Sequence, residues 1–294
     1  MALFKSKTEN DKIEDKKAAL KRMTERYTKH EPLPERAFLC SLFTGDNGTG
    51  KSGIATSYLN LLEPDEKIFY IDLEVGNYEN IIEYWREAYE RDQIIYETLK
   101  DLIWEEDLSK DTRKVYINYD KAMEELRRIA MWLDEYADKL KIRMVALDGL
   151  SKFKDYIEYQ MKLEKNIDLA GDPSRKFWRE RNKEFMETLE LYKALPIDVI
   201  LIGSSIFNKP PAEQNAIDRD INNMVSQKVV FEKDTSDGIT QFTAQVKKSR
   251  QNSKKNESKI PFGKINPKKE EAFLDGEKVF NAIISKKDKD KSGF

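Results

Sequence analysis

The sequence predicts an α/β fold in which a central, mostly parallel sheet is flanked by helices. Apolar, strand-like runs alternate with helix-like stretches from residue 37 to residue 202, a pattern typical of parallel strands joined by helices. A glycine-rich loop separates the first strand-like run from the first helix-like stretch. Beyond residue 227 apolar and polar residues alternate on both sides of a turn, which predicts a C-terminal antiparallel hairpin at one edge of the sheet.

Composition and charge exclude several classes of protein. The 294 residues include one Cys and one His, which excludes a disulfide framework and a zinc site built from Cys and His. No apolar run is long enough to span a membrane and no signal-peptide pattern is present, so we expect a cytoplasmic protein without a membrane partner. Charged residues make up 36% of the chain, but their formal charges nearly cancel to −2, so net charge indicates no partner.

The chain divides into three predicted parts. Residues 1–34 are strongly charged and predict a helix or arm that the prolines at its end would terminate. Residues 35–250 contain the alternating strands and helices and form the predicted main domain. Residues 251–294 are rich in lysine and predict a basic C-terminal extension whose end is disordered.

The strongest functional signal is the glycine-rich loop. It fits the phosphate-binding pattern in which a glycine, any four residues, a second glycine and a lysine are followed by serine or threonine. Glycines let successive backbone N–H groups turn toward an anion, the lysine adds a mobile charge for the β- and γ-phosphates, and the hydroxyl suits Mg²⁺. The predicted nucleotide-binding residues are Gly45, Asp46, Asn47, Gly48, Thr49, Gly50, Lys51, Ser52 and Gly53.

Two carboxylates complete the predicted reaction centre. Asp148 follows four apolar residues, as a Mg²⁺-binding aspartate does at the end of a buried strand, although an aspartate here could also cap the next helix. Many ATPases place a glutamate directly after this aspartate, whereas this chain has Gly149, so the group that activates water has to come from elsewhere. Glu74 closes the second strand-like run and is the expected base; the alternative is a solvent-exposed loop carboxylate.

Taken together, these motifs resemble those of the RecA-like ATPases. That group includes RecA and RadA recombinases, KaiC-type proteins, DnaB-type replicative helicases, and RecA-fold ATPases of phages and archaeal viruses. The resemblance rests on the phosphate loop, Glu74, Asp148 without a following acid, and the polar pair Ser204-Ser205 after a later strand, and it covers about residues 37–250. It implies a RecA-like phosphate-loop fold that hydrolyses ATP with Mg²⁺, bound through Ser52 and Asp148. If the chain is viral, the implied location is the host cytoplasm.

The resemblance also implies catalytic roles for residues outside the loop. Ser204 or Ser205 would stand where the family has a γ-phosphate sensor, often Gln or His, and a serine reaches less far. Lys248 and Arg250 match two cations that contact the nucleotide of a neighbouring subunit, in a ring or filament with active sites between subunits. Residues two apart on a strand share a face, so both cations could reach one target. Alternatively, both belong to a basic tail that starts at Lys247.

Three functions remain open at this point. The first is an oligomeric ATPase that acts on DNA, with single-stranded DNA among the forms it could bind, in recombination, replication or helicase-type work. Lys209, Arg219 and the lysine-rich end would contact the DNA phosphates. The second is a KaiC-like module that uses ATP to regulate or assemble partners without binding DNA. The third is a small-molecule kinase, in which Arg175, Arg179 and Arg181 would serve as the arginine-rich lid.

Overall fold

The computed structural model describes residues 38–74, 78–99, 104–107, 114–168, 171, 174–210, 212–249, 257–269 and 271–284. The predictions made for residues 1–34, for Arg250 and for the last ten residues lie outside the described residues. Among the helices that are described, none combines the length and apolar character needed to cross a bilayer.

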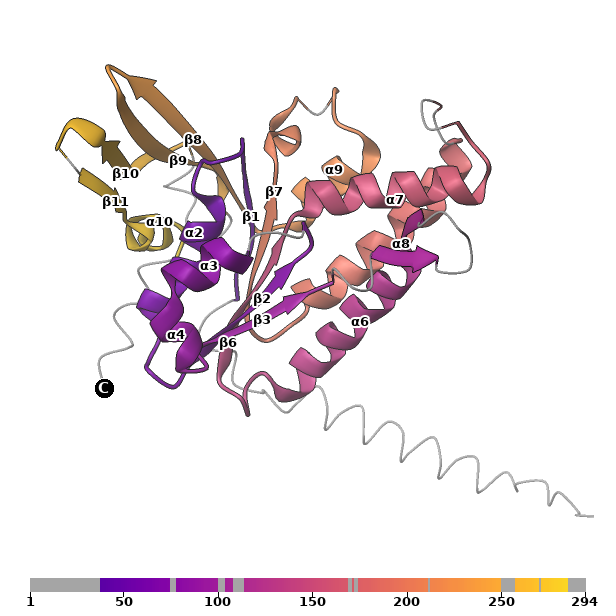
Figure 1. Ribbon diagram of the computed structural model, residues 1–294, viewed down its shortest axis with the longest axis horizontal. Helices are drawn as coiled ribbons and strands as arrows, with labels where there is room; N and C mark the ends of the chain where they lie inside the picture. Colours follow the sequence, from indigo (N-terminus) through magenta and orange to yellow (C-terminus); the bar gives the residue numbers. More distant parts are fainter. Residues whose placement is uncertain are drawn as a thin grey trace, which may run out of the picture. The chain divides into compact units, whose positions relative to one another are not determined.

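A nine-stranded sheet organises the described part of the chain (Figure 1). Its strand order is β11-β10-β9-β8-β1-β7-β6-β2-β3; the strands from β8 to β3 are parallel, and β9, β10 and β11 continue the sheet in antiparallel pairing. The mostly parallel sheet and the C-terminal hairpin β8–β9 are therefore confirmed. The strands are β1 (Cys40–Gly45), β2 (Lys67–Asp72), β3 (Ile94–Thr98), β6 (Ile142–Asp148), β7 (Asp198–Gly203), β8 (Gln227–Ser236), β9 (Ile239–Ser249), β10 (Lys259–Asn266) and β11 (Glu271–Leu274).

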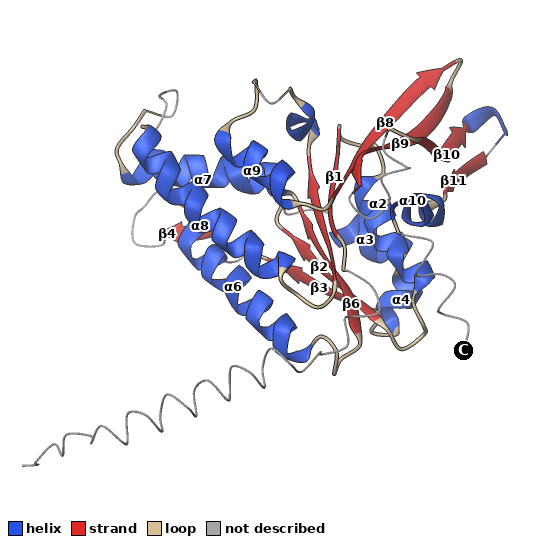
Figure 2. Ribbon diagram, turned by 180° about the vertical axis from the view of Figure 1, so that it is seen from behind, coloured by secondary structure: helices blue, strands red, loops and turns tan. Residues whose placement is uncertain are grey.

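Helices cover both faces of the parallel part of the sheet (Figures 1 and 2). The helices α2, α3, α4 and α10 lie on one face, and α6, α7, α8 and α9 lie on the other. Their bounds are α2 (Lys51–Thr56), α3 (Tyr78–Tyr84), α4 (Arg86–Glu90), α6 (Tyr119–Tyr136), α7 (Leu150–Glu164), α8 (Arg175–Lys193), α9 (Ala216–Met224) and α10 (Gly276–Ile283), with 3-10 turns η1 (Ser57–Leu61), η2 (Ser205–Asn208) and η4 (Pro267–Lys269).

Each face of the sheet has its own apolar core. Along β1, Leu42 packs into the core under α6–α9, whereas Phe43 packs into the core under α2 and α10. Along β6, Val145 and Met144 separate in the same way, because successive strand residues point to opposite faces. A strand buried on both sides reads as a continuous apolar run, which is why these strands are visible in the sequence.

One predicted element is wrong in type. The apolar residues between 77 and 107 are spaced as on the faces of a helix, which predicts a helical region there, but α4 ends at Glu90 and β3 pairs in parallel with β2. Asp92 has a φ of 56°, which turns the chain out of the helix. The run that follows, Ile94-Ile95-Tyr96, contains β-branched and aromatic side chains that favour a strand. A separate two-stranded pair, β4 (Trp104–Asp107) with β5 (Lys114–Ile117), follows it.

A second correction concerns the segment after β7. Adjacent prolines at positions 210 and 211 predict a loop over residues 204–223, but the chain forms η2 and then α9. The side chain of Asn215 caps α9 by accepting a hydrogen bond from the backbone N–H of Asp218 at 3.0 Å. The buried Ile217, Ile221 and Met224 repeat at helical spacing, so the helix is stabilised by packing against the core despite its polar sequence.

Candidate functional site

The phosphate loop lies where β1 ends and α2 begins, and two of its glycines are required by its geometry. A Cβ atom at Gly45 would lie 2.3 Å from the carbonyl oxygen of Phe231 on the neighbouring strand β8. Gly50 has a φ of 85° and is the residue before α2, in the left-handed region that favours glycine. The chain can therefore turn sharply from the strand and present the N-terminus of α2 at the carboxyl edge of the sheet.

Lys51 and Ser52 begin α2 with their side chains in defined positions. The Lys51 ammonium donates to the backbone oxygens of Gly45 at 3.0 Å and Asp46 at 2.8 Å. Burial lowers the pKa of Lys51, and the carboxylates of Asp148, Glu74 and Asp46 oppose that shift. The Ser52 hydroxyl donates to Oδ2 of Asp148 at 2.5 Å. A cation and a hydroxyl–carboxylate pair thus lie side by side at the start of the helix.

Asp148 ends β6 and is 4% exposed. Besides Ser52, the hydroxyl of Tyr70 on β2 donates to the same oxygen, Oδ2. Burial raises the pKa of Asp148 to about 6, the two hydrogen bonds act in the opposite direction, and the nearby Asp72 and Glu74 raise it further. The carboxylate is therefore desolvated, and it is held by hydroxyl donors that a metal ion could replace.

Glu74 lies directly beside Asp148 and Gly149. A Cβ at Gly149 would stand 2.7 Å from the Cβ of Glu74, and the backbone N–H of Leu73 donates to the carbonyl oxygen of Asp148 at 2.8 Å. The backbone N–H of Glu74 donates to Oδ1 of Asp72 at 3.0 Å. Parallel pairing of β2 with β6 produces this proximity, because Asp72 and Asp148 are register partners at the ends of the two strands.

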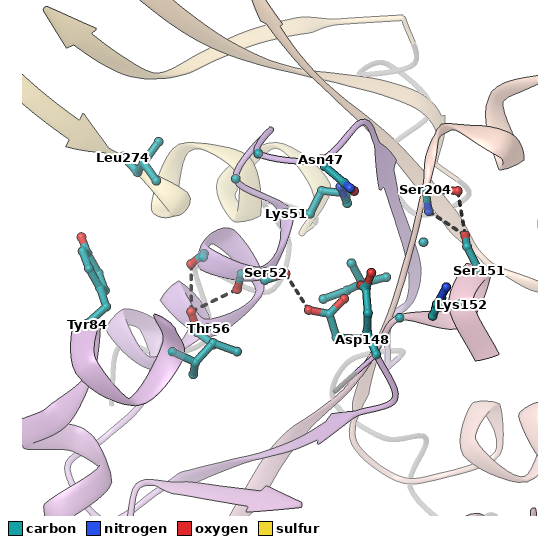
Figure 3. Close-up of a pocket in the computed structure, with 18 of the residues that line it drawn as sticks. Asn47, Lys51, Ser52, Thr56, Tyr84, Asp148, Ser151, Lys152, Ser204 and Leu274 are labelled. Carbon is teal, nitrogen blue, oxygen red and sulfur yellow. Dashed lines mark hydrogen bonds between the residues drawn. The ribbon is translucent and has the colours of Figure 1, made fainter. Parts of the chain in front are cut away.

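One cavity of about 510 Å³ collects most of the predicted residues (Figure 3). The lining contains two cations, two carboxylates and an aromatic and apolar rim. Of the predicted residues it includes Asn47, Gly48, Gly50, Lys51, Ser52, Gly53, Glu74, Asp148 and Ser204. The phosphate loop, the hydroxyl–carboxylate pair and the predicted base therefore open onto the same space.

Three further loop residues and Ser205 line a neighbouring hollow instead. The hydroxyl of Ser205 donates to Oδ1 of Asp46 at 2.5 Å, and the hydroxyl of Thr49 donates to the Asp46 carbonyl oxygen at 2.8 Å. Ser204 remains in the main cavity, where its backbone N–H and its hydroxyl are each 2.8 Å from the hydroxyl of Ser151. Both serines connect the end of β7 to the site, one to the phosphate loop and one to α7.

Lys248 is not among the residues that line the main cavity. It pairs with Lys228 across β8 and β9, and its ammonium donates to the backbone oxygens of Asn222 at 2.8 Å and Asn223 at 3.4 Å. The structure thus does not bring Lys248 to the main cavity of its own chain. Arg250, its predicted companion, lies beyond the described residues.

Several residues of the site were missed by sequence reasoning. Tyr70 and Tyr96 stack with ring centroids 5.8 Å apart, and Tyr96 donates to Oδ2 of Asp72 at 2.6 Å. Ser151 and Lys152 line the cavity from the first turn of α7. The tyrosines had no signal beyond a strand pattern, while the two α7 residues follow Asp148 closely enough that proximity along the chain could have identified them.

No protein-family model matches the chain, and no curated protein matches it either.

Proposed function

We propose that this protein is a Mg²⁺-dependent ATPase of the RecA-like group that works as an oligomer and acts on DNA. The observation that carries the proposal is the single cavity onto which Lys51, the Ser52–Asp148 pair and Glu74 all open. Each of these groups has a distinct task in phosphoryl transfer, and together they come from three separate parts of the chain: the start of α2, the end of β6 and the residues that follow β2. A glycine-rich surface turn without this function would need neither Asp148 nor Glu74 beside it.

The residues present fit a magnesium ion. Mg²⁺ prefers oxygen ligands and is held by one or two protein groups together with phosphate oxygens. The Ser52 hydroxyl and the Asp148 carboxylate supply two such oxygens, and they already lie 2.5 Å apart. When held by Ser52 and Asp148, the ion would neutralise part of the charge on the nucleotide phosphates.

The protein groups would divide the remaining work. The loop N–H groups and Lys51 bind the phosphates. Glu74 orients a water molecule and accepts its proton as the water oxygen attacks the γ-phosphorus and ADP leaves. The neighbouring Asp72 accepts the backbone N–H of Glu74, which fixes the point where the catalytic side chain leaves the strand.

DNA binding is supported by a basic hollow on the open face of β8 and β9, next to α9. Five cations and two carboxylates line it: Lys209, Arg219, Lys228, Lys247, Lys248, Glu232 and Glu257. Burial, with the added repulsion of the two neighbouring lysines, lowers the pKa of Lys228 to about 8. A polyanion would relieve this crowding of positive charge, and phosphate contacts supply most of the affinity of non-specific DNA binding.

The KaiC-like alternative is favoured by one feature of the same hollow. Lys247 is paired with Glu257 at 3.1 Å, and Lys248 is held by backbone oxygens of α9. Some of the positive charge is therefore committed to contacts within the chain. The kinase reading receives no comparable support, because Arg181 is held by Asp120 at 2.5 Å and Glu164 at 2.9 Å instead of standing free as a lid.

The ATPase proposal is tested by two substitutions measured for both binding and turnover. Lys51→Ala should abolish hydrolysis because it removes the positive charge that binds the nucleotide phosphates. Glu74→Gln should retain ATP but hydrolyse it at least ~100-fold more slowly, the loss typical of removing a general base. Glu87→Gln, at an exposed carboxylate on α4, is the matched control and should behave like the parent protein. Near-normal turnover by Lys51→Ala would contradict the nucleotide assignment.

The DNA assignment has a separate test in the salt dependence of binding. The logarithm of the affinity for single-stranded DNA should fall linearly with the logarithm of salt concentration, and Lys209→Gln and Arg219→Gln should each make the slope shallower by the equivalent of about one phosphate contact. A change in the nucleotide sequence of the DNA should leave the affinity nearly unchanged. Absence of binding at about 50 mM salt, where non-specific contacts are strongest, would favour the KaiC-like alternative.

A further inference from the structure

We infer that Lys152 is a second phosphate-binding cation, which the chain supplies to its own nucleotide site opposite the phosphate loop. The inference rests on the proposed ATPase function and deepens it by naming a catalytic residue that would contact the γ-phosphate. None of the motifs in the sequence points to Lys152, so the assignment comes from the geometry of the cavity.

The position of Lys152 is fixed by the backbone around it. It lies in the first turn of α7, which begins immediately after Asp148 and Gly149. The N–H of Gly149 donates to the carbonyl oxygen of Ile202 at 3.2 Å, and the hydroxyl of Ser151 accepts the N–H of Ser204 at 2.8 Å. Lys152 lines the cavity from α7, where Figure 3 draws it beside Ser151, whereas Lys51 extends from the phosphate loop at the start of α2.

The ammonium of Lys152 has no structural ion pair to neutralise it. It lies 5.8 Å from the centroid of the Tyr156 ring, one turn along the helix, and within the described residues no carboxylate is paired with it. Two other lysines of α7 differ in this respect, since Lys154 is paired with Asp218 and Lys162 with Glu158. Lys152 is exposed to the cavity, so an anion can reach it without breaking an existing ion pair.

The charge balance of the cavity indicates what the lysine is for. Its described lining carries Lys51 and Lys152 as cations, and Glu74 and Asp148 as acids. Without Lys152 the acids would outnumber the cations, although the ligand of the proposed reaction is itself an anion even with Mg²⁺ bound. A second cation compensates for the carboxylate that the base requires at this end of the site.

Lys152 lines the cavity from the turn that directly follows Asp148, the carboxylate that would hold the metal in the proposed reaction. In the proposed reaction Ser52 and Asp148 would hold the metal and Glu74 would hold the attacking water, so the γ-phosphate would lie between these groups. Charge spreads over the equatorial oxygens of the phosphoryl group during transfer, and a cation aimed at those oxygens stabilises the transition state more than the ground state. Lys51 approaches from the side of the loop and Lys152 from the side of α7.

The inference predicts a selective loss of catalysis in Lys152→Met. We expect kcat to fall by on the order of 100-fold, the size found when one charge-stabilising donor is removed. The affinity for ADP and the midpoint of thermal unfolding should stay unchanged, and the preference for ATP over ADP should shrink. Lys152→Arg should recover most of the turnover because it keeps the charge. Lys139→Met, which removes an exposed ammonium 4.8 Å from the Tyr136 ring outside the cavity, is the matched control.

A mixing experiment decides whether the lysine acts within its own chain. If Lys152 and Lys51 serve the same site of one chain, a mixture of Lys152→Met with Lys51→Ala contains no intact site and should regain no activity. Recovery of activity in this mixture would show that Lys152 acts on a neighbour and would overturn the inference, as would normal turnover by Lys152→Met. If the parent protein shows no hydrolysis that depends on Lys51, the proposed function fails and the inference falls with it. Hydrolysis that depends on Lys51 but not on Lys152 refutes the inference alone.

Discussion

Replacing Gly149 with alanine should disable hydrolysis by displacing Glu74, and the structure offers a matched control. Gly149 has a φ of 96°, and an added Cβ would lie 2.7 Å from the Cβ and 2.8 Å from the backbone nitrogen of Glu74. Gly238, in the β8–β9 turn, has a φ of 77°, and an added Cβ would meet nothing within 4 Å. Both substitutions place a side chain in the left-handed region and so share that backbone strain. Only Gly149→Ala also brings a Cβ into collision with Glu74, the predicted base.

The magnitudes follow from these distances. A side chain in the left-handed region costs about 1–2 kcal/mol, so Gly238→Ala should lower the free energy of unfolding by that amount. Gly149→Ala should lose the same and about 1–3 kcal/mol more, the usual cost of forcing an added group into a packed site. Because the collision is with backbone, Glu74 itself has to move, and a displacement of about 1 Å at a catalytic group can cost ~10²-fold in rate.

Two measurements separate the effects. Urea denaturation measures how far each substitution lowers the free energy of unfolding. ATP turnover by Gly149→Ala and Gly238→Ala is then compared under conditions where both variants are folded. Gly149→Ala should bind ADP normally but hydrolyse ATP ~10²-fold more slowly than Gly238→Ala, since the strain is common to both. Equal turnover in the two variants would refute the reasoning, because it would mean either that Glu74 is not the base or that the strand yields without moving it.

The remaining predictions concern three other parts of the chain. Burial raises the folded-state pKa of Asp148 to about 6, above its unfolded value of about 3.9, so stability falls as the pH rises from about 4 to about 6 and stays at the lower value above that. Asp148→Asn should therefore be more stable than the parent at pH 7 by about 1–3 kcal/mol, with a smaller gap near pH 4 in urea titrations, while Mg²⁺-dependent hydrolysis is lost; lower stability at pH 7 would contradict this. Cys40 is the one cysteine, and burial raises its pKa to about 12, so a thiol reagent should label it at the rate of unfolding and not sooner. Arg250→Ala mixed with Lys51→Ala should regain the ATPase activity that each lacks alone if Arg250 acts on a neighbouring subunit, and full activity of Arg250→Ala by itself would exclude that role.

The local parts of the site could be predicted from the sequence, because their geometry depends on neighbouring residues in the chain. The phosphate loop needs its glycines in a fixed pattern between a strand and a helix. Glu74 and Asp148 follow buried strands, and the carboxyl ends of parallel strands meet at one edge of a sheet. Once the sheet is predicted to be parallel, these carboxylates are expected on the rim that carries the loop, and the structure places them there.

The rest depends on tertiary structure that no local pattern encodes. The segment that forms β3 begins with Ile94 and Ile95, and two adjacent apolar residues fit the face of a helix as well as a buried strand. Pairing with β2 makes this segment a strand, and it brings Tyr96 against Tyr70 and Asp72. The α9 helix has the same difficulty, since its polar sequence becomes helical through packing of a few apolar residues against the core.

The two proposed sources of positive charge have different consequences for the assembled protein. A cation from α7 belongs to the same rigid stretch as Asp148, so each chain would hold it ready for its own nucleotide. Lys248 instead donates to backbone oxygens at the end of α9, and it would have to leave them to reach the nucleotide of a neighbour. Those contacts border the basic hollow that contains Arg219. Basal hydrolysis would thus depend on Lys152, whereas any contribution from Lys248 would be linked to assembly and to whatever occupies the hollow.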